Sequence, residues 1–244
     1  MNPLILRPEP AASALAATLR AHGFQPQICP LFEFRAGADI SHLSELLVQS
    51  DLVIATSAAA LEFACAEIAN WPQHCNYFSV GQTTAKLWLA QQIPVIVPTD
   101  ERSEGLLALE QLQHVNGKLI LILRGEGGRP LLGDILSERG ATVCYAECYQ
   151  RHSLTYCGET LWSDWQSKQI DSVIITSSDI FFRLMNLLPP EAQPWLAQLS
   201  WITVSERIAS DIRQSGFSSV VISDGAHHEQ VLAALQQSED KKDE

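Results

Sequence analysis

The sequence predicts an α/β protein made of two similar domains, each a parallel sheet covered by helices, which face one another across a cleft. Short apolar stretches alternate with amphipathic segments, a pattern typical of parallel sheets with helical crossovers. In addition, three strand-to-helix junctions occur twice: 4–8 matches 121–125, 54–57 matches 174–177, and 80–85 matches 204–209. The offsets of 117, 120 and 124 residues indicate two copies of one unit and not the shorter period of a solenoid.

The N-terminal part of the chain shows this pattern from its first residues. Residues 4–6 are the expected first strand, and 11–22 is amphipathic and predicts a helix. Farther along, 52–69 is apolar, but it contains two glutamates and divides at Thr56-Ser57 into a strand and a helix. It therefore predicts no membrane span. Residues 85–91 and 208–215 are further amphipathic segments.

Residues 119–151 carry the most information. An apolar run leads to Arg124 and a turn whose glycines permit positive φ and close approach of the backbone. The segment 130–139 then carries apolar residues at helical spacing and stops at a glycine, a common residue just after a helix end. The next strand delivers Tyr149 and Arg151 at its far end. Ligands bind at the carboxyl ends of parallel strands, so we expect these polar residues to lie at a binding edge.

Composition limits the classes of function. The chain has 244 residues, 46% of them hydrophobic, and a formal net charge of −12. That length suffices for two domains that each bury a core. The charge argues against nucleic acid or an anionic membrane surface as a partner, because both are bound mainly by Lys and Arg. The six cysteines form no Cys-x-x-Cys pair and no secretory signal precedes the first strand, so we expect a reduced, cytoplasmic protein. The charged residues 239–244 are expected to form a disordered tail.

Short motifs spread over nearly the whole chain resemble those of the uroporphyrinogen-III synthase family, in the family's order. The chain opens with Leu-Ile-Leu-Arg-Pro at 4–8, and the strand that ends at 149–151 reads Tyr-Gln-Arg. Thr-Ser follows a strand at 56–57, and Thr-Ser-Ser follows another at 176–178. The remaining motifs are Val-Gly-Gln-Thr-Thr-Ala at 80–85 and Val-Ser-Glu-Arg at 204–207. Each motif is weak alone, but the joint order is specific.

The resemblance implies a topology that periodicity does not supply. One domain would be discontinuous, formed by 1–34 plus 152–238, and the other, 37–148, would be inserted into it. Two extended crossings, near 32–36 and 148–153, would link the domains as a two-strand hinge.

The resemblance also implies an activity. The family cyclises hydroxymethylbilane, a linear tetrapyrrole polycarboxylate, in haem biosynthesis. The terminal hydroxyl leaves as water, which makes the enzyme a lyase (hydro-lyase), and the last pyrrole ring is inverted through a spiro intermediate. The protein has mainly to hold a flexible substrate in one conformation. We expect no cofactor and no metal, and a transient contact with the preceding pathway enzyme.

Tyr149 is the expected proton donor to the leaving hydroxyl, because the family places a tyrosine there and a strand end would bring its phenol to the cleft. The alternative is a structural tyrosine at the hinge whose hydroxyl bonds to backbone. Local positive charge at strand ends would hold the carboxylates of the substrate on this acidic protein. The expected substrate-binding residues are Arg7, Ser57, Thr84, Arg124, Gly128, Arg129, Ser177, Ser178 and Ser205.

Each of these residues has a structural alternative. The serines and Thr84 lie at predicted helix starts, where Ser and Thr are common as caps, and their backbone N–H groups could bind a ligand in place of the hydroxyls. Arg124 and Arg129 could form surface ion pairs with acidic neighbours. Family members often have a threonine where this chain has Ile208, so a polar role in that turn would fall to Ser205.

Two other functions remain open. A hinged two-domain protein can close on an anionic small molecule as a binding or sensory protein, without chemistry. A nucleotide-dependent enzyme could use the glycine-rich turn 125–128, but Pro130 stands at the third glycine position of the dinucleotide motif, and no Walker lysine occurs. The adjacent His227 and His228 would point to different faces of a helix and predict no metal site.

Overall fold

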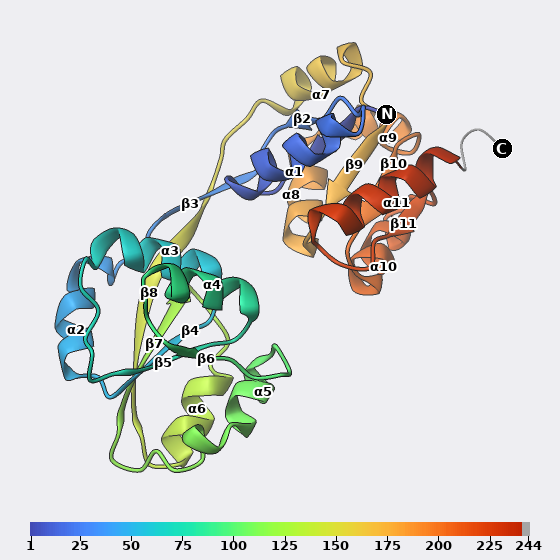
Figure 1. The fold of residues 1–244 in the computed structure, drawn as a ribbon. Helices are drawn as coiled ribbons and strands as arrows, with labels where there is room; N and C mark the ends of the chain where they lie inside the picture. The colour runs from blue at the N-terminus through green and yellow to red at the C-terminus, as the bar shows by residue number, and fades with distance from the viewer. Residues whose placement is uncertain (241–244) are drawn as a thin grey trace. The chain divides into compact units, whose positions relative to one another are not determined.

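The structure is a computed structural model that describes residues 1–240. The chain divides into two compact units: the first unit comprises 1–33 and the residues from 152 onward, and the second unit comprises 34–151. Each unit is built on a predominantly parallel sheet with helices on both faces, which confirms the predicted fold class (Figure 1). Of the expected disordered tail, 239–240 belong to the last helix, and 241–244 lie outside the described residues.

The first unit has a five-stranded sheet with the order β11-β10-β9-β1-β2, in which all neighbours are parallel. Its strands are β1 (Pro3–Ile5), β2 (Gln27–Ile28), β9 (Ser172–Ile175), β10 (Ser200–Thr203) and β11 (Val220–Ile222). Its helices are α1 (Ala11–Ala21), α7 (Gly158–Ser167), α8 (Ser178–Leu187), the 3-10 turn η3 (Pro190–Ala192), α9 (Gln193–Leu196), α10 (Glu206–Gln214) and α11 (His228–Asp240).

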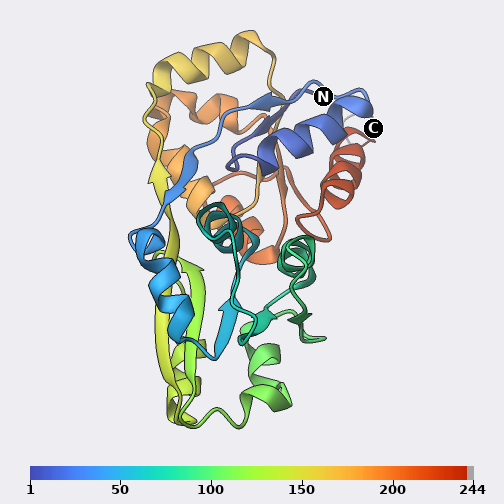
Figure 2. The same cartoon turned by 60° about the vertical axis from the view of Figure 1, so that its left-hand side comes forward.

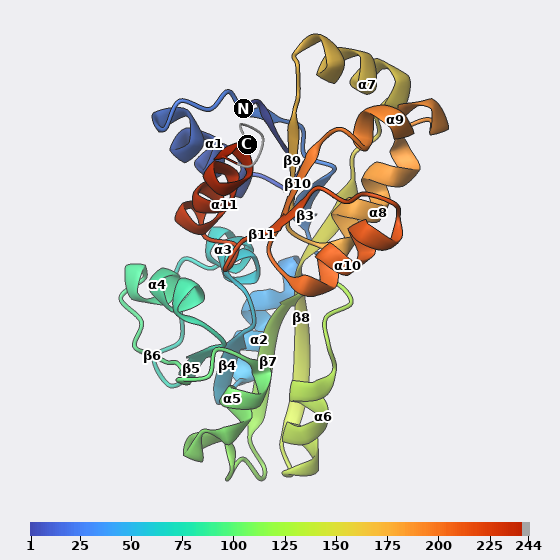
Figure 3. The ribbon, with the colours of Figure 1, turned by 90° about the vertical axis from the view of Figure 1, so that its right-hand side faces the viewer.

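Apolar side chains fix which helices cover each face of the first sheet. Ile5, Ile174 and Ile202 join α1 and α11 in one buried cluster, and these two helices lie side by side in Figure 3. Val173 and Trp201, whose side chains alternate with these along the strands, join α8 and α10 in the cluster on the other face. Both faces are therefore apolar, as expected for a sheet of short buried strands.

The second unit has a six-stranded sheet with the order β3-β8-β7-β4-β5-β6. Its strands are β3 (Phe32–Ala36), β4 (Leu52–Ala55), β5 (Asn76–Ser79), β6 (Val95–Ile96), β7 (Leu119–Gly125) and β8 (Thr142–Ser153). Its helices are the 3-10 turn η1 (Ile40–His42), α2 (Leu43–Gln49), α3 (Ala58–Glu67), α4 (Gln82–Ala90), α5 (Ser103–Ala108), the 3-10 turn η2 (Glu110–Leu112) and α6 (Leu131–Glu138).

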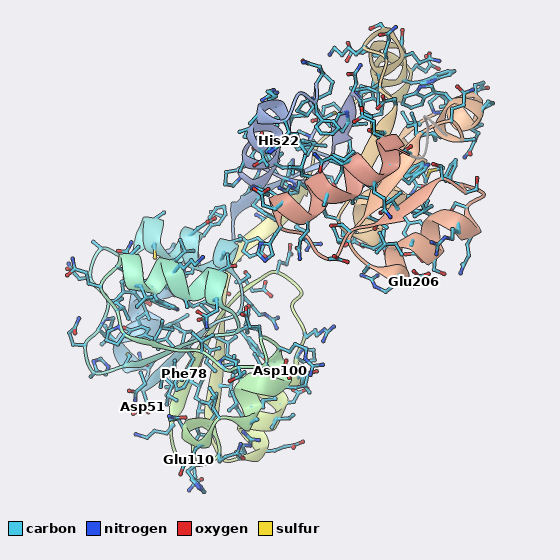
Figure 4. All side chains as sticks on the ribbon, turned by 45° about the vertical axis from the view of Figure 1, so that its right-hand side comes forward. His22, Asp51, Phe78, Asp100, Glu110 and Glu206 are labelled. Carbon is cyan, nitrogen blue, oxygen red and sulfur yellow. The ribbon has the colours of Figure 1, made fainter. Side chains whose placement is uncertain are left out.

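Alternation along β7 shows how the second sheet is covered. Leu121 and Leu123 pack in the cluster that contains α2, α3 and α4, whereas Ile120 and Ile122 pack in the cluster that contains α5 and α6. Phe78 of β5, labelled in Figure 4, belongs to the latter cluster and is 1% exposed. The continuous apolar run in the sequence is thus a strand buried on both faces.

The internal repeat of the sequence corresponds to equal strand orders. The order β2-β1-β9-β10-β11 of the first unit matches β8-β7-β4-β5-β6 of the second unit, place for place. The first two strands of the chain therefore correspond to β7 and β8, and β9 to β11 correspond to β4 to β6. One unit is a circularly permuted copy of the other, and this accounts for the offsets of the three repeated junctions.

The predicted helices are present, but two of them begin earlier than their apolar pattern. The segments expected at 85–91 and 208–215 begin at Gln82 and Glu206. Ser205 precedes the second of these, and its hydroxyl accepts a hydrogen bond from the N–H of Ile208 at 3.5 Å. A cap and a polar first turn come before the first buried residue, so hydrophobic periodicity alone places the start too late.

The two crossings between the units are the paired strands β3 and β8 (Figure 2). The N–H of Gly37 donates to the carbonyl of Cys148 at 2.9 Å, and the N–H of Leu154 donates to the carbonyl of Leu31 at 3.1 Å. The residue numbers rise from 31 to 37 in the first segment as they fall from 154 to 148 in its partner, so the two segments are antiparallel. Arg183 of α8 donates to the carbonyls of Leu31 and Leu154 at 3.0 and 2.6 Å, which ties both crossings to the first unit. None of the helices in residues 1–240 is long and apolar enough to span a bilayer.

Replacing Trp201 by alanine is expected to lower the free energy of unfolding of the first unit by about 3–5 kcal/mol, because a large cavity would remain in the core. The side chain is fully buried and stacks on Phe217 with 4.6 Å between ring centroids. Leu89→Ala is the control, since Leu89 is 60% exposed and its loss should cost within about 0.5 kcal/mol. Urea unfolding of both variants is the measurement; equal midpoints would contradict the packing described.

Candidate functional site

The sheet of the second unit reverses its strand order between β4 and β7. The two strands are parallel neighbours, yet α3, which follows β4, and α6, which follows the turn after β7, pack on opposite faces of the sheet. The chain segments leaving the two strands therefore diverge. This is the place in an open α/β sheet where a crevice forms at the carboxyl ends of the strands and ligands bind.

A cavity of about 280 Å³ lies at this place, entirely within the second unit. Its lining comes from the ends of β4, β7 and β8: Thr56, Ser57, Arg124, Gly125, Glu126, Gly127, Gly128, Tyr149 and Arg151. Of the predicted site residues, Ser57, Arg124, Gly128 and Tyr149 are brought together here. Arg129, Thr84 and the predicted residues of the first unit are outside this lining.

Thr56 and Ser57 form the β4 side of the cavity. The backbone N–H and the hydroxyl of Thr56 both donate to the carbonyl of Leu123, each at 3.0 Å. Ser57 is the N-cap of α3, and its hydroxyl accepts from the N–H of Ala60 at 3.2 Å. The cap leaves the other first-turn N–H groups of the helix, with its positive dipole end, as anion-binding groups.

Arg124 forms the β7 side. Its Nη2 donates to Glu147 Oε1 at 3.1 Å, its Nη1 donates to the carbonyl of Gly128 at 3.0 Å, and its guanidinium carbon lies 4.1 Å from the ring centroid of Tyr145. The Nε is buried and has no hydrogen-bond partner within residues 1–240. A buried donor without a partner is costly.

Glu147 organises the turn after β7. The same oxygen that accepts from Arg124 also accepts from the N–H of Gly127 at 3.3 Å, and the N–H of Glu126 donates to the carbonyl of Tyr149 at 2.8 Å. The turn is thereby fixed to β8 by both backbone and side chain. Glu147 was not among the predicted site residues, because its position in the sequence shows only that it shares a strand face with Tyr145.

Tyr149 is held by aromatic packing. Its ring centroid lies 4.8 Å from that of Phe34, edge to face, and 6.1 Å from that of Phe63, stacked. A bulge in the β7–β8 pairing sets Tyr149 opposite Gly125, where only glycine fits, because a Cβ on Gly125 would lie 2.5 Å from Tyr149 Cζ. Tyr149 lines the cavity, and none of the hydrogen bonds found within residues 1–240 involves its hydroxyl. The phenol therefore lines the cavity with its donor available.

Two predicted residues of the second unit lie elsewhere. Arg129 is exposed, beyond the turn that lines the cavity. Thr84 is 5% exposed in the first turn of α4. At that helix start the N–H of Gln82 donates to a carboxylate oxygen of Glu101 at 3.0 Å, so the protein's own acid already occupies the place that a ligand carboxylate could take.

Arg7 of the first unit is turned inward. Its Nε and Nη2 donate to the carbonyl of Ala11 at 3.0 and 2.7 Å, and Nη1 donates to that of Ala226 at 3.5 Å. Burial lowers the pKa of this guanidinium from its usual value. Arg7 corresponds to Arg124 in the repeat, yet it bonds to backbone of its own unit.

The predicted serines of the first unit lie at helix starts. Ser177 accepts from the N–H of Ile180 at 3.3 Å, and Ser205 accepts from that of Ile208 at 3.5 Å. Ser178 bonds to two charged side chains, Asp211 and Arg207. Within residues 1–240, no group of three or more His, Cys, Asp or Glu side chains is arranged to hold a metal ion.

In this two-unit α/β protein, a cation, a phenol and a helix start are gathered at a sheet crevice of the kind in which open α/β sheets bind ligands. Comparison with known proteins defines the family. Residues 13–233 match the family described as uroporphyrinogen-III synthase HemD. The chain therefore belongs to the uroporphyrinogen-III synthase family, and this membership assigns it to haem biosynthesis and favours the enzyme over the hinged binding protein.

Individual relatives agree with this assignment. The chain is 39% identical to uroporphyrinogen-III synthase of Salmonella typhimurium (strain LT2) and 37% identical to that of Escherichia coli (strain K12), over 97% of this chain and 100% of each relative. Among solved structures, it is similar to uroporphyrinogen-III synthetase of Helicobacter pylori, with a TM-score of 0.62, 17% identity, and coverage of 97% of this chain and 99% of the other. A Thermus thermophilus mutant enzyme gives a TM-score of 0.59 at 16% identity, covering 99% and 100%.

Gly125→Ala is expected to reduce the rate of uroporphyrinogen III formation at least about tenfold, because the new methyl group would push the Tyr149 ring out of place. A decrease of this size is expected when one well-oriented group is misplaced. The fold should persist, as circular dichroism would show. Gly117→Ala is the matched control: Gly117 has φ +73°, but a Cβ there meets no atom within 4 Å, so this variant should lose some stability and keep its rate. Equal rates for the two variants would contradict the described placement of Tyr149.

Proposed function

We propose that this chain converts hydroxymethylbilane to uroporphyrinogen III with loss of water, and so acts as a lyase, with the reacting end of the substrate held in the cavity at the ends of β4, β7 and β8. The observation that carries the proposal is the joint placement of the unbonded Tyr149 phenol and the Arg124 guanidinium in one cavity. Family membership supplies the reaction class, and the cavity supplies groups that fit it.

The first step needs an acid. The C–O bond of the terminal hydroxymethyl group breaks as the pyrrole nitrogen donates electrons, and the hydroxyl leaves as water once it receives a proton. Tyr149 is the proton donor in this proposal. Arg124 and Arg151 line the same cavity.

The later steps return that proton. The cationic azafulvene is attacked by the substituted carbon of the last pyrrole ring, and the resulting spiro intermediate opens and closes with the ring inverted. The ring carbon that forms the final bond then loses its hydrogen as a proton, which restores the phenol and balances the loss of one water. The sequence of steps contains no oxidation or reduction and consumes no second reactant.

Substrate orientation falls to the cations and the backbone donors. The Arg124 guanidinium and the start of α3 at Ser57 both line the cavity, where a substrate carboxylate could accept hydrogen bonds. Holding one carboxylate fixes the adjacent ring relative to Tyr149. In this proposal proximity, and not a strong nucleophile or base, supplies most of the rate and the choice of isomer.

Tyr149→Phe is expected to lower kcat for uroporphyrinogen III about 10²- to 10⁴-fold, which is the usual contribution of a positioned acid. The matched control is Tyr145→Phe on the same strand, because the Tyr145 hydroxyl donates only to the carbonyl of Pro130 at 3.3 Å on the exposed side. The phenyl ring left in the control still lies under Arg124. The measurement is the rate and isomer ratio of uroporphyrin after oxidation and chromatography.

The outcomes separate the role of Tyr149 from the reaction itself. Type III product from the unaltered protein, with equal kcat in both phenylalanine variants, would remove Tyr149 as the acid. Only type I product from the unaltered protein, as in a protein-free control, would overturn the proposed reaction.

Arg124→Lys is expected to raise KM about tenfold, because an ammonium group cannot bond to Glu147 and to the Gly128 carbonyl in the fork geometry of a guanidinium. Arg139→Lys is the matched control. Arg139 likewise donates to two acceptors, the carbonyls of Leu107 and Leu112, but it is outside the cavity lining. Its substitution should change thermal stability and leave KM within about twofold; the same rise in KM for both variants would count against a binding role of Arg124.

Two further expectations belong to this proposal. Hydroxymethylbilane closes spontaneously to the symmetric isomer, so a transient contact with the enzyme that makes it would shorten the time in free solution. That contact, and a cytoplasmic location, stay predictions; a pull-down between the two purified enzymes during turnover is the direct test of the contact.

A further inference from the structure

Three side chains of the first unit form a chain of hydrogen bonds at the carboxyl edge of its sheet. Ser178 is the first residue of α8 and follows β9, and Arg207 lies in the first turn of α10 and follows β10. Because β9 and β10 are parallel neighbours, the two residues lie at the same edge. Ser178 donates to Asp211 Oδ2 at 2.5 Å, and Arg207 Nη1 donates to Ser178 Oγ at 2.9 Å.

The direction of these bonds fixes what each group can do. Asp211, as a carboxylate, can only accept, so the hydroxyl hydrogen of Ser178 is committed to it. The lone pairs of Ser178 then face Arg207 and hold one of its nitrogens. Ser178 is 9% exposed, whereas Arg207 is exposed. Ser178 and Asp211 therefore form an anchor that holds the exposed guanidinium of Arg207.

The acids nearest to Arg207 along α10 are engaged with other partners. Arg207 and Asp211 are four residues apart, a spacing that commonly gives a direct ion pair, but Ser178 stands between them in the hydrogen-bond chain. Glu206, labelled in Figure 4, pairs with Arg213 at 2.7 Å. Within residues 1–240, the Nε and Nη2 of Arg207 have no hydrogen-bond partner. These donors remain for an external acceptor.

The second unit shows that this arrangement is not required by the fold. At the corresponding positions of its α3 and α4, the second unit has Ala58, Thr83 and Leu87 in place of Ser178, Arg207 and Asp211. The same strand order and helix starts therefore form without the charged chain of bonds. Its presence in one copy alone points to a use other than folding.

We propose that Arg207, positioned by Ser178 and Asp211, binds a carboxylate of the linear tetrapyrrole at the carboxyl edge of the first-unit sheet. This inference rests on the proposed function. A guanidinium held at one nitrogen presents a fork that fits a carboxylate. The guanidinium also supplies local positive charge on a protein whose formal net charge is −12.

The test is steady-state kinetics of Arg207→Gln and Arg207→Lys, with hydroxymethylbilane generated in the assay. Lys168→Gln is the matched control, because it also removes one exposed positive charge but lies just before β9, at the opposite edge of the same sheet. Arg207→Gln should raise KM about tenfold with kcat within about threefold, as expected for a group that binds ground and transition states equally. Arg207→Lys should recover part of the loss, and added salt should reduce the difference between wild type and Arg207→Gln.

Asp211→Asn tests the anchor. This variant should raise KM by less than Arg207→Gln does, and the double variant should match Arg207→Gln alone, because the anchor acts only through the guanidinium. Type III product from the wild type, with the KM of Arg207→Gln equal to that of Lys168→Gln, would overturn this inference and leave the proposed function intact. A lowered melting temperature with unchanged KM would also overturn it, since it would make the chain of bonds purely structural. Only type I product from the wild type would overturn the proposed function, and this inference with it.

Discussion

The reversal of strand order in each parallel sheet is the constraint on which the rest of the structure depends. Adjacent parallel strands whose helices leave toward opposite faces cannot both cover the sheet edge between them. In the second unit this opens the cavity between β4 and β7. In the first unit the same reversal occurs between β1 and β9, and there Arg7 bonds to the carbonyls of Ala11 and Ala226. At the same topological position, Arg124 therefore lines a cavity, whereas Arg7 is turned inward to the backbone of its own unit.

Much of the fold follows from local sequence signals. The apolar runs, the Thr-Ser junctions and the internal repeat predicted the two similar sheets and their covering helices, because burial and capping act over a few residues. The site was harder to predict because it depends on long-range pairing. The register shift between Arg124 and Gly125 of β7, which sets Tyr149 opposite Gly125, has no local signal. Nor does Glu147 signal by itself that it will join Arg124 to the turn.

The hydroxyl residues show why a motif alone does not assign a role. Ser57, Ser177 and Ser205 occupy the same position before three helices, and each accepts from the N–H three residues later. Their capping role is thus sufficient to explain their presence at these junctions. What distinguishes the junctions is the neighbouring side chains. Ser57 adjoins a cavity with a cation and a phenol, whereas Ser177 precedes a serine that anchors another cation.

The two cations that we propose to bind the substrate are held in different ways. Arg124 is paired directly with Glu147 and is only 16% exposed, so its field outside the cavity is weakened by its partner. Arg207 is held through the neutral hydroxyl of Ser178, which keeps the Asp211 carboxylate one group farther away. Coulomb energy falls with distance and is screened at exposed sites. The acid partner of Arg207 therefore weakens its electric field toward solvent less than Glu147 weakens that of Arg124. A direct pair suits precise orientation of a reacting ring, and a cation separated from its acid suits attraction of a substrate carboxylate from water.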